Sequence, residues 1–88
     1  MIHLIKNSQG KLEVITVRNG NYIVGSRQGY ETRAGAYGNI RAQMKSFGVG
    51  VCQFQDDTLD KPVVFSLSVK GKPVATTGKP KKKYIQSK

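Results

Sequence analysis

The chain has 88 residues, one cysteine, one histidine and a net charge of +10, from fifteen Lys and Arg against five Asp and Glu. A chain of this length forms one small domain that buries only about 60% of its unfolded surface, so its stability margin is narrow. A single cysteine excludes an internal disulfide, and the lack of a Cys/His cluster argues against structural zinc. We therefore expect no metal or cofactor, and we expect a homodimer or higher oligomer as the remaining reinforcement.

The first residues, MIHLIK, form too short an apolar run for a signal peptide, and no stretch approaches transmembrane length. We expect a cytoplasmic protein without membrane contact. The high positive charge favours polyanionic partners. It is concentrated between Lys70 and Lys88, which hold seven lysines and no acid. We predict a single α+β domain over 1–78 and a basic flexible tail over 79–88.

The N-terminal part has strand character. "HLIKN" (3–7) is a short strand candidate, and "KLEVITVR" (11–18) alternates β-branched residues between two faces. Asn19-Gly20 follows, and both residues tolerate the positive φ of a tight hairpin turn. The returning strand is "NYIVGS" (21–26).

A helix is predicted from Thr32 to Phe47. The Thr32 hydroxyl can cap the first turn, and Gly48 favours a left-handed end. One apolar stripe is expected, made of Tyr37, Ile40, Met44 and Phe47. Gly35 and Gly38 oppose a helix, and two explanations stand: close packing on a sheet, or a phosphate-binding loop. "GAYG" lacks the spacing of the known phosphate-loop motifs, which favours packing.

Three more strand candidates follow the helix: "VGVCQFQ" (49–55), "VVFSLSV" (63–69) and "PVATT" (73–77). "DDTLDKP" (56–62) is a polar connection between the first two. The predicted fold is therefore α+β, with an antiparallel β-sheet of about five or six short strands and one α-helix packed on one face.

An internal similarity is visible when the chain is shifted by fifty-one residues, because "LEVITVRNGNYIVGS" then aligns with "VVFSLSVKGKPVATT". Both segments read as strand, turn and strand. A degenerate repeat (11–48 and 63–77) that has lost its second helix, and chance similarity between two hairpins, both remain open.

The pattern of hairpin, capped helix and "NIRA" (39–42) resembles the YegP-like family of small bacterial domains of unknown function. The matching residues are Asn19-Gly20, Ile23, Ser26, "GYETRA" (29–34) and "NIRA". The resemblance covers Lys6 to Gly48, and 63–77 more weakly. It implies one or two copies of a hairpin-plus-helix unit whose strands join, within one chain or in a dimer. The family brings no established activity.

Five residues were considered for catalysis or metal binding, and each has a simpler interpretation. Asp56 and Asp57 are adjacent, so on a strand they point to opposite faces and in a loop they are solvated. His3 has no partner evident in the sequence. Cys52 has apolar neighbours, which suits a buried inert thiol. Ser26 lacks the G-x-S-x-G spacing of a nucleophile elbow. We expect no enzyme.

The C-terminal region gives the strongest functional signal. Lysines neutralise phosphates without reading sequence, and Tyr84 can stack on an exposed base. The candidate nucleic-acid-binding residues are Lys70, Lys72, Lys79, Lys81, Lys82, Lys83 and Tyr84. Two functions are expected from this: a non-catalytic binding module that contacts nucleic acid, or a bacterial or phage accessory protein that docks on an acidic protein.

Overall fold

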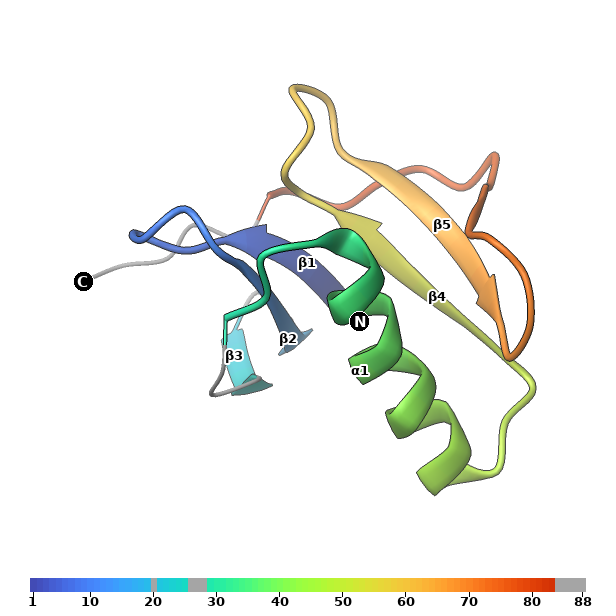
Figure 1. Ribbon diagram of the computed structural model, residues 1–88. Helices are drawn as coiled ribbons and strands as arrows, with labels where there is room; N and C mark the ends of the chain where they lie inside the picture. Colours follow the sequence, from blue (N-terminus) through green and yellow to red (C-terminus); the bar gives the residue numbers. More distant parts are fainter. Residues whose placement is uncertain (20, 26–28, 84–88) are drawn as a thin grey trace.

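The computed structural model describes residues 1–19, 21–25 and 29–83. Within these residues it has six strands and one helix, in an α+β arrangement that confirms the predicted fold class (Figure 1). The elements are β1 (Ile2–Lys6), β2 (Leu12–Arg18), β3 (Asn21–Gly25), α1 (Arg33–Phe47), β4 (Val51–Asp56), β5 (Val63–Ser68) and β6 (Val74–Ala75). The strands form one sheet in the order β3-β2-β1-β4-β5-β6, and α1 lies across one face.

The sheet is mixed, whereas an antiparallel sheet was expected. β1 and β4 run parallel, with Ile2 opposite Phe54 and Leu4 opposite Asp56. The other four pairs are antiparallel. A parallel neighbour requires a crossover connection, and α1 supplies it between β3 and β4. The strand order is symmetric about the β1–β4 pair, and duplication of the unit remains a prediction.

Helix α1 begins and ends where its capping residues predict. The Thr32 hydroxyl accepts a hydrogen bond from the Gly35 N–H at 3.2 Å. At the other end Gly48 adopts φ 70°, and its N–H donates to the Lys45 carbonyl. This left-handed backbone conformation is one that glycine adopts without a side-chain clash, which ends the helix at Phe47.

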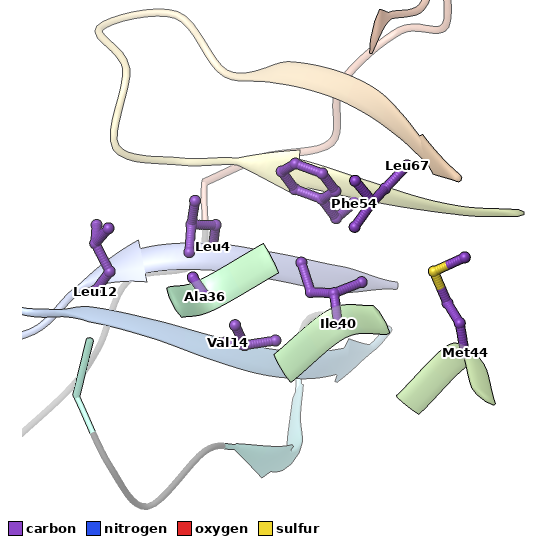
Figure 2. Packing of buried hydrophobic residues seen from close by; sticks show 8 residues of the cluster. All are labelled: Leu4, Leu12, Val14, Ala36, Ile40, Met44, Phe54 and Leu67. Atoms are coloured by element: carbon purple, nitrogen blue, oxygen red, sulfur yellow. The ribbon is translucent and has the colours of Figure 1, made fainter. Parts of the chain in front are cut away.

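The main core lies between α1 and the sheet (Figure 2). Its buried members are Leu4, Leu12, Val14, Ala36, Ile40, Met44, Phe54 and Leu67. The predicted stripe is correct for Ile40 and Met44, but it is wrong for Phe47, which is 79% exposed. The buried row runs through Ala36 instead, because residues four apart form one ridge on a helix. Phe47 lines an open groove beside Val24 of β3.

The two helix glycines have different surroundings. A Cβ at Gly35 would lie 3.0 Å from Cδ1 of Tyr30, whose backbone pairs with Leu12. A Cβ at Gly38 would have no neighbour within 4 Å. Close packing therefore explains why a glycine stands at position 35, although it packs against Tyr30 rather than the sheet. It does not explain the glycine at position 38.

The opposite face of the sheet carries a smaller cluster, made of Ile5, Ile15 and Val17. Beyond β6 the chain turns onto this face and crosses behind β5 and β4 (Figure 1). The predicted return strand over 73–77 is shorter than expected, since only Val74–Ala75 pair with β5. The Thr76 N–H extends that pairing by donating to the Val64 carbonyl at 2.8 Å.

Candidate nucleic-acid interface

The six predicted lysines that the structure describes lie at two places, the turn between β5 and β6 and the segment that follows β6. Lys70 and Lys72 are exposed in the turn between β5 and β6. The exposed Lys79, Lys81, Lys82 and Lys83 lie on the segment that crosses the opposite face. Tyr84, the remaining predicted site residue, lies outside the described residues, as do Gly20 and Ser26.

The segment that carries these lysines is attached to the sheet through Gln55 of β4. The Lys81 N–H donates to the Gln55 Oε1 at 2.7 Å, and the Gln55 Nε2 donates to the Lys81 carbonyl at 2.6 Å. The Gln55 side-chain amide thus forms two hydrogen bonds with the backbone of Lys81, as the backbone of a neighbouring strand would. Gln55 is fully buried, whereas the Lys81 side chain is exposed. The expectation of a flexible tail from residue 79 did not include this attachment.

A buried polar network surrounds Gln55. Its Nε2 also donates to Asp57 Oδ1 at 2.8 Å, and the His3 Nδ1–H donates to Asp57 Oδ2 at 2.7 Å. His3 is 3% exposed. Buried polar groups need partners, and these side chains supply them to one another. The network orients Gln55 toward Lys81, so His3 has a partner that sequence could not assign.

Asp56 points to the other face, as adjacent residues on a strand must. Its Oδ1 accepts from the Thr58 N–H at 2.9 Å, and its Oδ2 lies 3.5 Å from the Arg33 Nε. Both aspartate side chains are buried. The alternative in which the two side chains point to opposite faces is therefore correct, and the alternative of solvated loop residues is wrong, because each has charged or polar partners that offset the loss of water. These contacts make both side chains part of the packed structure around the β4–β5 turn.

Cys52 is half-buried in β4, and burial raises the pKa of its thiol. A raised pKa lowers the fraction of thiolate, which is the reactive form. The thiol is less deeply buried than predicted, and its inertness remains a prediction.

A groove of about 490 Å³ lies beside the β5–β6 turn, on the helix side of the sheet. Ala34, Tyr37 and Arg41 line it from α1, and Phe65, Gly71, Lys72 and Pro73 line it from the strands and the turn. It combines two aromatic rings with two cationic side chains. Among the described residues, no acid pairs with Arg41 or Lys72.

Arg41 also holds the turn in place. Its Nε donates to the Ser68 carbonyl at 3.3 Å, and its Nη2 donates to the Gly71 carbonyl. Gly71 has φ 105°, a conformation that residues with a Cβ rarely adopt. The guanidinium therefore fixes the position of Lys72, the next residue, and keeps its own charge at the groove.

The aromatic rings are supported from below by Phe54. Its ring centroid lies 5.6 Å from that of Tyr37 and 5.5 Å from that of Phe65. Phe54 is fully buried, while the other two rings are partly exposed. Burial raises the pKa of the Tyr37 phenol, Arg33 opposes that rise and Asp56 adds to it. Tyr37 is therefore neutral at physiological pH.

Sequence reasoning missed the groove. Ala34, Tyr37 and Arg41 are spaced by three and four residues, so one helix face could have been recognised. The sequence does not indicate which residues of β5 and the following turn face these helix residues. Their position depends on the strand order of the sheet, which local patterns do not predict.

No model of a protein family, no curated protein and no solved structure matches this chain. The resemblance to the YegP-like family accordingly remains a prediction. In the described part of the chain, no helix is both long and apolar enough to cross a membrane.

Proposed function

We propose that this protein is a non-catalytic binding module that contacts nucleic acid through the β5–β6 turn and the basic segment that follows β6. The observation that carries the proposal is the unbalanced charge of this part of the sequence: six lysines and no acid lie between residues 70 and 83. Lysines in such a region release counterions from phosphates whatever the base sequence. The proposal includes a cytoplasmic location, where nucleic acid is available.

The test compares two variants of equal net charge. The segment variant replaces Lys79, Lys81, Lys82 and Lys83 by Gln. The control variant replaces four exposed lysines elsewhere by Gln, namely Lys6, Lys11, Lys45 and Lys61. Substitution is preferred to deletion because the backbone of Lys81 is bonded to Gln55.

Binding of a labelled oligonucleotide is measured by fluorescence anisotropy at several salt concentrations. Each phosphate contact contributes about −0.9 on B-DNA and about −0.7 on single strands to the slope of log affinity against log salt. The segment variant should flatten the slope by roughly two to four units, and the control variant should change it much less. Equal losses in both variants would show a diffuse charge effect, and no binding by the unmodified protein would refute the proposal.

Docking on an acidic protein is the second candidate function, and a different groove favours it. This groove lies on the other side of α1 and is lined mainly by apolar or uncharged groups, among them Val24 and the exposed Phe47. A partner that combines apolar and acidic residues would suit this groove on a molecule of charge +10. After nuclease treatment, retention of one protein by the unmodified chain but not by Phe47→Ser would support this function.

We further propose that the chain forms a homodimer. β3 is an edge strand without a charged residue, and its Ile23 and Val24 are more than half exposed. Unpaired edges of this kind associate readily. Light scattering at high micromolar concentration should show a dimer, and a monomer there would contradict it.

A further inference from the structure

We propose that the groove between α1 and the β5–β6 turn is a site for one base of single-stranded nucleic acid. The inference rests on the proposed nucleic-acid function and adds to it a preference for unpaired bases. It assigns a role to Tyr37 and Phe65 that the charge distribution alone does not supply.

The first argument is the shape of the aromatic surface. Tyr37 and Phe65 both line the groove, and both rings contact the buried Phe54 beneath them. Rings held in this way lose little freedom when a ligand binds, so they form a preorganised surface for stacking. Base stacking on aromatic side chains tolerates any base, because every base has a π face.

The second argument is charge complementarity. Arg41 and Lys72 line the same groove, and neither is paired with an acid among the described residues. A base in the groove brings its own phosphate and that of its neighbour to these cations. Arg41 is already oriented by the Ser68 and Gly71 carbonyls. An apolar ligand would contact only the rings, and an acidic peptide would contact mainly the cations. A nucleotide contacts both.

The third argument is the size and position of the groove. Its volume of about 490 Å³ falls within the range of about 300–1,000 Å³ that is usual for small-ligand sites. It opens at the edge that carries Lys70 and Lys72. A base within a duplex is stacked on its neighbours and cannot enter. Single strands therefore gain a contact that duplexes lack.

The experiment uses two probes that differ only in their bases: an oligothymidylate and an abasic oligonucleotide of the same length. Tyr37→Leu and Phe65→Leu each remove a ring but keep an apolar side chain. Each should weaken oligothymidylate binding about 5- to 150-fold, which corresponds to one stacked base, and leave the abasic probe unaffected. The matched control is Phe47→Leu, on the opposite side of α1, which should change neither.

Two further variants keep the inference testable if a leucine variant unfolds. Tyr37→Phe keeps the ring, so it should lose much less affinity for oligothymidylate than the loss expected when the ring is removed. The chain has no tryptophan, so Phe65→Trp introduces a single fluorophore at the groove. Its emission should be quenched by oligothymidylate and by oligouridylate, which compares DNA with RNA, and not by the abasic probe or by duplex DNA.

Several outcomes would overturn the site, and they separate it from the proposed function. Equal losses on both probes would show that the groove contacts phosphate alone. Unchanged binding in the ring variants, while the segment variant loses affinity, would leave nucleic-acid binding intact without this site. If the unmodified protein binds neither probe, the proposed function fails together with the site.

Discussion

On one face of the sheet α1 buries Ile40 and Met44 against Phe54 in a mainly apolar core. On the opposite face, Gln55 forms two hydrogen bonds with the backbone of the C-terminal segment, and Asp57 accepts a third from the Gln55 amide. Apolar burial is non-directional and supplies most of the stability. Hydrogen bonds contribute about 1 kcal/mol each in net terms, but they specify a position. The helix face therefore stabilises the fold, and the opposite face fixes where the basic segment runs.

The largest expected effect is on the helix face. Phe54→Ala removes the ring on which Tyr37 and Phe65 rest, and should lower the free energy of unfolding by about 3–5 kcal/mol. Phe47→Ala is the control, because Phe47 is 79% exposed and should change stability by at most about 0.5 kcal/mol. Urea denaturation followed by circular dichroism measures both. Similar losses in the two variants would contradict this view of the core.

The next effect tests the opposite face. Gln55→Ala leaves Asp57 Oδ1 and the Lys81 backbone without their amide partner, and should destabilise the fold by about 1–3 kcal/mol. The Lys81 amide should lose its protection from hydrogen exchange, and trypsin should cut after Lys81 faster.

Gln53→Ala is the matched control, since Gln53 lies on the same strand but is exposed. It should leave both the hydrogen exchange and the cleavage unchanged. An unprotected Lys81 amide in the unmodified protein would show that the segment is not held.

A smaller effect separates the two helix glycines. Gly38→Ala should raise the free energy of unfolding by up to about 1 kcal/mol, because alanine favours the helix and its Cβ meets open space. Gly35→Ala should gain less or lose stability, since its Cβ would lie 3.0 Å from the Tyr30 ring. Thermal unfolding of the two variants compares them directly. A larger gain for Gly35→Ala would contradict the packing of Tyr30 on α1.

The smallest effect concerns Tyr37 at high pH. Burial raises its pKa in the folded chain, so above about pH 10 the unfolded chain releases this proton more readily than the folded chain. The stability that the protonated Tyr37 phenol contributes is fully present below its pKa in the unfolded chain. It is lost as the pH rises through its pKa in the folded chain. Tyr37→Phe should therefore reduce the loss of stability between neutral and alkaline pH. Parallel pH profiles for the two proteins would exclude this contribution.

The sequence by itself determined the features that depend on neighbouring residues. The bounds of α1 follow from Thr32 and Gly48, which act within one helical turn. The hairpin of β2 and β3 follows from strand alternation and from Asn19, which has φ 54°. The location of the excess positive charge is also a direct property of the sequence. These features need no knowledge of what packs against them.

Only the tertiary structure decided the contacts between distant residues. His3 and Asp57 are 54 positions apart, and Gln55 and Lys81 are 26 apart. The first pair depends on the parallel pairing of β1 with β4, and the groove that joins Tyr37 to Phe65 depends on where α1 lies on the sheet. The pairing of β1 with β4 requires that one edge of β1 is still free when the chain returns to the sheet after α1. Local patterns carry no information about a free edge, because its position is set by the packing of the whole chain.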